Sequence, residues 1–371
     1  MASIRQRPDG VWRARYRDSS GKEHARHFKL KRDAQRWLDE VTTSVVTGQY
    51  VDPKAGRLTF QEYAETWMSA QVHRPTTAEL YRSHLERHAF PVLGHLPLGS
   101  VLRTTVQGWV KGLTGTLAPA TVGVVYTVVA SVFRAAVRDR KIGSTPCDGI
   151  ALPEVVKTRL QPLTTAQVDA LSGAVPRDLR ALVILTAGTG MRQGEVLGLT
   201  RDRLRLRGQN PEVTVDRQLV TMQGGDTAFG PLKTGASYRS IPLPRVVVEA
   251  LNVHLAERDV EDDGLLFAID GRGITRQRFG HLWRPAAKAA GLTAATGTGM
   301  HALRHYYASL LIRYGESVKT VQGRLGHKSA TETLDTYGHM WADSDDRTRE
   351  AVDTVLGAPA DSPRTDEQST S

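Results

Sequence analysis

Four short segments in the C-terminal half of this 371-residue chain carry polar side chains whose types and spacing suit phosphate chemistry. Arg192 follows a glycine-rich bend, and Glu195 comes three residues later on the same face of a predicted helix. His301 and Arg304 have the same spacing, so an imidazole and a guanidinium share one helical turn. These two groups can hold two oxygens of a single phosphate. Taken singly, however, an arginine and a glutamate three residues apart are usually a surface pair that contributes little.

Three further residues extend this candidate site. Lys233 lies at the tip or in the second strand of a predicted hairpin, His327 follows the bend GRLGH, and Tyr337 comes ten residues later. Taken singly, a hairpin lysine is usually solvated and a lone tyrosine is usually half-buried packing. His301 and His305 lie four residues apart, as zinc ligands on one helix do, but the HExxH glutamate is absent and no third ligand is evident. We therefore expect no metal ion and no cofactor.

Taken together, six of these residues stand in an order that resembles the site of the tyrosine recombinase (phage integrase) family. They are Arg192, Lys233, His301, Arg304, His327 and Tyr337, with LGH before the tyrosine and TYGH around it. The resemblance covers residues 160–345, and the overall layout is similar to integrases of actinobacterial phages and integrative elements. It implies a site-specific DNA recombinase that cuts and rejoins strands through a 3′-phosphotyrosyl intermediate, integrating and excising a mobile element without a metal ion.

The resemblance also implies a role for each residue. Tyr337 would attack the phosphodiester, and the permanently charged Arg192 and Arg304 would stabilise the charge that develops on the phosphoryl oxygens. A phenol of pKa ~10 is only about 0.1% ionised at neutral pH, so the nucleophile must lose its proton during the attack. Lys233 is our candidate general acid for the leaving 5′-oxygen.

The two histidines of the motif and the glutamate would assist. His301 and His327 are left to hydrogen-bond the phosphate and to help proton transfer at Tyr337, and the division of these two roles between them stays open. Glu195 would orient the Arg192 guanidinium from behind.

The family also implies an assembly. Strand exchange between two duplexes needs four active sites, so we expect a homotetramer on double-stranded DNA attachment sites. The segment 341–371, after the tyrosine motif, is a candidate for packing against a neighbouring protomer. Host architectural proteins and excision-directing proteins are further expected partners.

The charge of the chain also favours a nucleic-acid partner. Lys and Arg number 49 against 39 Asp and Glu, a net charge of +10, and residues 1–36 alone contribute +7. This basic stretch resembles the arm-binding domain of phage integrases, although a small basic domain that only docks on its neighbour would have the same composition. Its candidate DNA-binding residues are Arg5, Arg7, Arg13, Arg15, Arg17 and Lys29.

The periodicity of apolar residues predicts a multidomain, mainly α protein with small β elements. A β-hairpin over 10–28 and a helix over 31–45 form a ββα or βββα module. In the C-terminal half, two strand-like runs, 212–220 and 237–243, flank a connecting loop over 224–236. Helices are predicted over 60–70, 76–90 and 119–139, over 179–199 with an interruption at AGTGM, and from about residues 165, 245, 276, 301, 317 and 330.

Breaks in these patterns predict the domain limits. We expect an N-terminal arm-type DNA-binding module (1–56), a helical, SAM-like core-binding domain (57–155), a mixed α+β catalytic domain (160–356) and a disordered tail (357–371). The chain has one cysteine, Cys147, no signal peptide and no run of 18 apolar residues. We therefore expect a soluble, cytoplasmic, nucleoid-associated protein without a membrane partner.

Other readings stay open beside the integrase. A Xer-type chromosome-dimer resolvase has the same chemistry, but such chains typically lack an extra N-terminal module. A type IB topoisomerase is also similar in chemistry, although the TYGH context and the basic N-terminal stretch favour recombination. From another functional class, a DNA-binding regulator could keep the fold without cutting.

Overall fold

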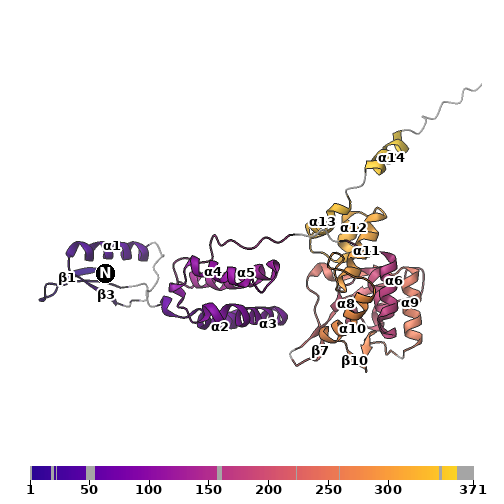
Figure 1. The fold of residues 1–371 in the computed structure, drawn as a ribbon, viewed down its shortest axis with the longest axis horizontal. Helices are drawn as coiled ribbons and strands as arrows, with labels where there is room; N and C mark the ends of the chain where they lie inside the picture. The colour runs from indigo at the N-terminus through magenta and orange to yellow at the C-terminus, as the bar shows by residue number, and fades with distance from the viewer. Residues whose placement is uncertain are drawn as a thin grey trace, which may run out of the picture. The chain divides into compact units, whose positions relative to one another are not determined.

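The computed structural model describes residues 2–17, 21, 23–46, 55–156, 161–222, 224–258, 260–341 and 345–356. The chain divides between residues 157 and 158 into two compact units (Figure 1). The multidomain, mainly helical class predicted from the sequence is confirmed. The predicted tail 357–371 lies outside the described residues.

The first unit begins with a three-stranded antiparallel sheet of strands β1 (Ser3–Gln6), β2 (Trp12–Arg17) and β3 (Glu23–Phe28). Helix α1 (Lys31–Val46) lies across one face of this sheet (Figure 1). Ala14 and Tyr16 point to the helix and are buried, as Ala34 and Leu38 are on the helix side. Of the two predicted arrangements, the structure therefore has βββα.

A helical bundle follows in the same unit. It consists of α2 (Phe60–Ala70), α3 (Pro75–His84), the π-helix η2 (Leu85–Gly94), α4 (Arg103–Leu113) and α5 (Pro119–Arg138). Thr59 caps α2, because its hydroxyl accepts from the backbone N–H of Glu62. The rings of Phe60 and Phe133 stack at 5.0 Å in the bundle core.

Helix α5 is long and apolar enough by composition to span a membrane. Its valines at 122, 125, 128, 129 and 132 are buried in the bundle core, so packing inside the bundle accounts for this composition. The chain then folds back on the bundle, where Ile142 and Cys147 are buried and the Tyr126 hydroxyl donates to the Cys147 carbonyl.

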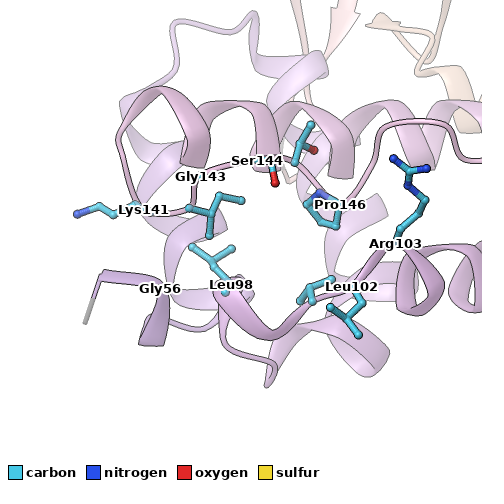
Figure 2. A pocket seen from close by; sticks show the side chains of 12 residues that line it. Gly56, Leu98, Leu102, Arg103, Lys141, Gly143, Ser144 and Pro146 are labelled. Carbon is cyan, nitrogen blue, oxygen red and sulfur yellow. The ribbon is translucent and has the colours of Figure 1, made fainter. Parts of the chain in front are cut away.

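An open hollow lies beside this returning segment. Leu98 and Leu102 line one side and Gly143 and Pro146 the other, with Lys141 and Arg103 at its two ends (Figure 2).

The second unit carries the candidate site on helices. Its helices are α6 (Thr165–Ala174), α7 (Arg180–Thr189), α8 (Gln193–Leu197), α9 (Arg245–Ala256), α10 (Arg276–Ala289), α11 (His301–Arg313), α12 (Val318–Leu325), α13 (Ala330–Tyr337) and α14 (Asp345–Leu356). Residue Gly190 in the left-handed region ends α7, which accounts for the predicted interruption at AGTGM.

Small antiparallel sheets complete this unit. They are β4 (Leu204–Arg205), β5 (Glu212–Val215) and β8 (Arg239–Pro242) in one sheet, the pair β6 (Gln218–Thr221) and β7 (Thr227–Gly230), and the pair β9 (Ala268–Ile269) and β10 (Arg272–Gly273). The backbone of β6 approaches α8 closely, because a Cβ on Gly198 would lie 2.5 Å from the Leu219 nitrogen. This contact holds the hairpin against the helix that carries Glu195.

The strand prediction was partly wrong. The run 212–220 breaks at Asp216 and Arg217, where Asp216 binds Arg203 and Arg217 through its carboxylate instead of continuing one strand. The partner of β6 is β7, which lies inside the predicted loop 224–236, whereas β8 pairs with β5. The sequence did not predict β7 because the strand has only four residues, TAFG, and no clear alternation of buried and exposed side chains. Its large apolar residue, Phe229, is half exposed and lies beneath the Arg217 guanidinium.

Candidate active site

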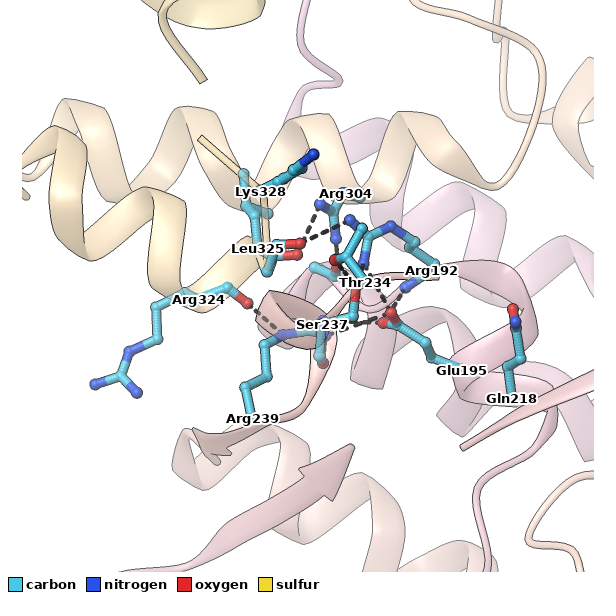
Figure 3. Close-up of polar contacts among 12 residues, drawn as sticks. Arg192, Glu195, Gln218, Thr234, Ser237, Arg239, Arg304, Arg324, Leu325 and Lys328 are labelled. Carbon is cyan, nitrogen blue, oxygen red and sulfur yellow. Dashed lines mark hydrogen bonds and ion pairs between the residues drawn. The ribbon is translucent and has the colours of Figure 1, made fainter. Parts of the chain in front are cut away.

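The candidate site is built around the C-terminal end of α12. The last carbonyls of a helix have no intrahelical donor and carry a partial negative charge. Three consecutive carbonyls here each accept a hydrogen bond from a different arginine. The pairs are Arg324 with Arg239 Nε (2.8 Å), Leu325 with Arg304 Nη2 (2.8 Å) and Gly326 with Arg192 Nη2 (2.9 Å). Figure 3 shows the three guanidinium groups converging on this helix end.

Arg304 is the most buried of the three arginines. Its side chain is 1% exposed, and Nη1 donates to the carbonyl of Gly190 at 2.7 Å. Burial and repulsion from Arg192 lower the pKa of Arg304 to about 9, which leaves the guanidinium charged at neutral pH. The buried Nε has no acceptor in the described part of the chain, which is uncommon for a buried donor.

Arg192 and Glu195 are joined as the sequence predicts. Arg192 precedes α8, and its Nη1 donates to the Glu195 carboxylate at 2.8 Å and to the Ser237 hydroxyl at 3.2 Å. The same carboxylate accepts from the backbone N–H of Arg192 at 2.9 Å. A carboxylate in the first turn of a helix is also stabilised by the helix dipole. Glu195 therefore fixes the direction of the Arg192 side chain, which keeps 27% of its surface exposed.

Arg239 of β8 belongs to the same network, although the sequence did not single it out. Its Nη2 lies 2.9 Å from Glu195 Oε2, and the two side chains are 6% and 2% exposed. Burial alone would raise the pKa of Glu195, but the charges and hydrogen bonds of Arg239 and Arg192 hold it below its ordinary value. The carboxylate is therefore ionised between two arginines.

Two glycines allow this close packing. Gly190 and Gly326 both have φ of 65°, and each supplies a carbonyl to a site arginine. A Cβ on Gly190 would lie 2.5 Å from Cδ1 of Tyr307, and one on Gly326 would lie 3.0 Å from the Ala236 carbonyl. Glycine meets both the conformational and the steric requirement at these turns.

Tyr337, the last residue of α13, is 1% exposed and packs in a small apolar cluster with Tyr307 and Leu325. Its hydroxyl lies 2.7 Å from Nδ1 of His305. Burial raises the pKa of Tyr337 to about 12, against a smaller opposite effect of the Arg304 charge. In this state the phenol is protonated and hydrogen-bonded to an imidazole.

The two histidines of the motif lie on either side of this pair. His327 is buried, its Nδ1 lies 2.8 Å from Thr333 Oγ1, and its ring is stacked on that of Tyr337 at 6.4 Å. His301 reaches the surface and meets the His305 ring edge-on at 4.6 Å. Desolvation by the surrounding protein atoms, followed by the Arg304 charge, lowers the pKa of each of these two residues to about 4. Both are neutral at physiological pH.

Lys233 lies in the connection between the paired strands β5 and β8. It is exposed and follows β7 by three residues, in the segment that leads to Ser237 and β8. Of its two predicted positions, the second strand is excluded, because β8 begins only at Arg239.

The predicted DNA-binding arginines lie on the first unit. The face of β2 opposite α1 carries Arg13, Arg15 and Arg17 at every second position. Arg5 of β1 lies directly across from Arg13 in the strand register, and so on the same face. Glu23 on β3 reaches all three β2 arginines at 3.4–3.9 Å. Arg7 and Lys29 lie just outside the strands.

No group of three or more His, Cys, Asp or Glu side chains placed to hold a metal ion occurs among the described residues. The pair His301 and His305 thus has no third ligand there.

Comparison with known proteins identifies the family of this chain. Residues 161–343 match the Phage integrase family, residues 60–159 match the Phage integrase central domain, and residues 2–47 match the Phage integrase N-terminal domain. The chain belongs to the phage integrase family. It is a site-specific tyrosine recombinase with DNA as its partner.

Relatives of this integrase include proteins of mycobacterial phages. The chain is 28% identical over 351 residues to the putative prophage phiRv2 integrase of Mycobacterium tuberculosis, covering 91% of this chain and 90% of the relative. It is 25% identical over 313 residues to the integrase of Mycobacterium phage D29, covering 81% and 82%.

Two solved structures share the fold of this integrase. The Tn1549 transposon integrase in complex with a circular intermediate DNA has a TM-score of 0.66 at 22% identity, covering 80% of this chain and 99% of that one. A lambda integrase dimer bound to a core site has a TM-score of 0.57 at 18% identity, covering 92% and 95%.

Sequence reasoning missed His305 and Arg239 as members of the site. His305 stands four residues after His301, and this helical spacing places it beside a residue of the motif on the same helix face. Arg239 and the apolar, buried Ile241 are two residues apart on one strand. Side chains at this spacing point to the same face, so Arg239 is expected on the buried face. Both signals were present in the sequence.

Proposed function

We propose that this integrase cuts a DNA strand through Tyr337, whose Oη attacks a phosphodiester and forms a 3′-phosphotyrosyl bond with release of a 5′-hydroxyl. The observation that supports this most directly is that the phenol and two guanidinium groups gather at one helix end. Tyr337 packs on Leu325, whose carbonyl binds Arg304, and the next carbonyl binds Arg192. A phosphate placed there meets a nucleophile and two fixed positive charges.

The arginines lower the barrier by electrostatics. Negative charge grows on the non-bridging oxygens as the phenol attacks, and prepositioned donors in a water-poor site stabilise it without reorganising. The Glu195 carboxylate and the α12 carbonyls hold Arg192 and Arg304 in place before the DNA arrives. Lys233 acts as general acid for the leaving 5′-oxygen.

The two motif histidines act at the phosphate. His301 and His327 are neutral in the free site and hydrogen-bond the phosphoryl oxygens once DNA is bound. The Thr333 hydroxyl fixes the orientation of His327.

The covalent bond to Tyr337 conserves the energy of the broken phosphodiester. A 5′-hydroxyl from another duplex can therefore attack it and rejoin the strands without a nucleotide cofactor. This is how the site would exchange strands between a mobile element and a host attachment site.

The first unit supplies DNA binding away from the cut. We assign the sheet face of Arg5, Arg13, Arg15 and Arg17 to an arm-type site, with Arg7 and Lys29 at its margins, and the helical region to core-site DNA. Guanidinium groups on one sheet face can contact the phosphates of a duplex groove.

We also propose a tetramer on DNA, with help from host architectural and excision-directing proteins in the cytoplasm. A lambda integrase tetramer bound to a Holliday junction shares this fold, with a TM-score of 0.54. Helix α14 exposes Val352, Val355 and Leu356 by 49%, 75% and 79%. Such an apolar stripe fits a neighbouring protomer.

A suicide substrate tests the proposal. Duplex DNA with a nick close to the cut site loses the short 5′-hydroxyl fragment, so the covalent protein–DNA adduct accumulates. Tyr337→Phe should abolish the adduct while DNA binding persists. Tyr314→Phe is the matched control, because Tyr314 is 83% exposed and lies at the C-terminal end of α11 in the same unit.

An adduct that persists in Tyr337→Phe would contradict the assignment of the nucleophile. Specific binding without any adduct in the wild-type protein would instead support the non-cutting regulator.

A further inference from the structure

We propose that His305, which is not among the six residues of the motif, is the catalytic base that takes the phenolic proton of Tyr337 during strand cleavage. The inference deepens the proposed function and rests on it, since it requires Tyr337 to be the nucleophile.

The contact between the two residues has the geometry of a proton-transfer pair. The His305 Nδ1 and the Tyr337 Oη are 2.7 Å apart, inside the range in which a base can take a proton directly. The two rings meet at 63° with their centroids 5.5 Å apart. Helix α11 holds the imidazole and α13 ends at the phenol, so both partners stand on regular structure.

The other histidines of the site face different partners. The Nδ1 of His327 is engaged with Thr333, and that ring lies nearly parallel to the phenol ring with the two centroids 6.4 Å apart. His301 contacts the ring of His305. Among the described residues, His305 is the one whose side chain hydrogen-bonds the phenol.

The protonation states give this hydrogen bond a direction. Burial, reinforced by His301, Arg304 and His327, lowers the pKa of His305 to about 3, so the imidazole is neutral at physiological pH. The buried phenol keeps its proton. The phenol therefore donates and Nδ1 accepts, which leaves the imidazole proton on Nε2.

Bound DNA strengthens this base. His305 is surrounded by the Arg304 and His301 side chains of its own helix, by Tyr337 of α13 and by His327. A phosphate anion held by the arginines offsets their positive charge and so raises the affinity of the imidazole for a proton. The base thus becomes effective when the substrate is in place.

The proton balance closes over one cycle. As Oη bonds to phosphorus, its O–H bond breaks and the proton moves to Nδ1, while the bond from phosphorus to the 5′-oxygen breaks and that oxygen takes a proton from Lys233. Rejoining reverses both transfers, because the incoming 5′-hydroxyl returns a proton to Lys233 and Oη regains one from His305.

The first test separates a base from a residue that only positions the phenol. In His305→Asn the amide oxygen can still accept the hydrogen bond, but it does not take up a proton at neutral pH. We expect normal DNA binding, and adduct formation on the suicide substrate slower by about 10²- to 10⁴-fold at pH 7. The defect should shrink as the pH rises toward that at which the phenol ionises in solution. His281→Asn, an exposed histidine of α10, is the matched control.

A second test uses DNA whose leaving 5′-oxygen is replaced by sulfur, which departs without a proton. This substrate should restore cleavage by Lys233→Ala and should leave His305→Asn defective. If His305→Asn folds poorly, His305→Ala with added imidazole replaces it, and rescue of at least about tenfold is expected.

Several results would overturn the proposal. Cleavage by His305→Asn within about threefold of wild type would leave only a positioning role. Rescue of that variant by the sulfur substrate would show that His305 acts on the leaving group and not on the phenol. A cleavage defect in His301→Asn, with normal cleavage by His305→Asn, would show that His301 is the base. An adduct that survives in Tyr337→Phe would refute the proposed function itself. An adduct that is lost in Tyr337→Phe but normal in His305→Asn would refute only the base.

Discussion

Arg239 and Glu195 form a buried ion pair behind the candidate active site, with Nη2 2.9 Å from Oε2. Removing one partner and leaving the other charge buried without compensation typically costs about 3–5 kcal/mol. Arg239→Met should lower the free energy of unfolding of the second unit by less than this, because Arg192 still pairs with Glu195, and urea unfolding measures the loss. It should also slow adduct formation, because Glu195 then turns toward Arg192 alone.

The matched control for this prediction is Arg245→Met. Arg245 pairs with Glu249 at 3.0 Å, but its side chain is 92% exposed. Such pairs contribute at most about 1 kcal/mol. Equal unfolding curves for the two variants would show that the Arg239 pair does not support the site.

Gly190 supplies a second prediction. Alanine there must adopt φ of 65°, and its Cβ would lie 2.5 Å from Tyr307 and 2.9 Å from Leu325. Gly190→Ala should cost at least about 2 kcal/mol of unfolding free energy. The shift would also displace the carbonyl that accepts from Arg304, so cleavage should fall even where the protein is folded.

Gly173→Ala controls for the loss of a glycine. Gly173 lies in α6, and a Cβ added there would meet nothing within 4 Å. This change should be neutral or stabilising by up to about 1 kcal/mol. A Gly190→Ala protein as stable as Gly173→Ala would contradict the close packing at the α7 terminus.

Much of the helical framework could be predicted because its signals are local. Thr59 and Thr164 cap helices within three residues of chain, and the apolar period of 119–139 follows from one buried face. The strands were harder, since β6 finds its partner β7 in a segment of four residues without a strong alternating pattern. Strand pairing depends on contacts that a short run does not encode.

In the candidate site, too, the local contacts could be predicted from the sequence and the long-range contacts could not. The sequence predicted that Glu195 would orient Arg192, because helical spacing alone brings the two together. It did not predict that Arg192, Arg239 and Arg304 bind three successive carbonyls. These contacts join residues that are 134, 85 and 21 positions apart along the chain, and helical spacing says nothing about such pairs. The partner of Tyr337 was missed for that reason too, since His305 is 32 residues away.

The histidines give the second unit a pH-dependent stability. His301, His305 and His327 have pKa values of about 4, 3 and 4, below the ordinary 6.5. As the pH falls below 6.5, these histidines become protonated in the unfolded chain before they do in the folded chain. Their contribution to the free energy of unfolding is therefore complete above pH 6.5 and is lost as the pH falls toward 4. The urea midpoint should drop between pH 7 and pH 5, and His327→Gln should drop less. The same slope in both proteins would contradict the prediction.

The sheet face of the first unit predicts a salt dependence of DNA binding. Each arginine that contacts a phosphate adds about 0.9 to the slope of log affinity against log salt. Arg13→Gln should make the slope shallower by about 1, measured on duplex DNA from the attachment region.

Glu23→Gln should strengthen binding, because Glu23 now pairs with three arginines of that face. Arg32→Gln removes the same charge from α1, on the other side of the sheet, and should leave the slope unchanged. An equal effect of Arg13→Gln and Arg32→Gln would mean that net charge, and not this face, attracts DNA.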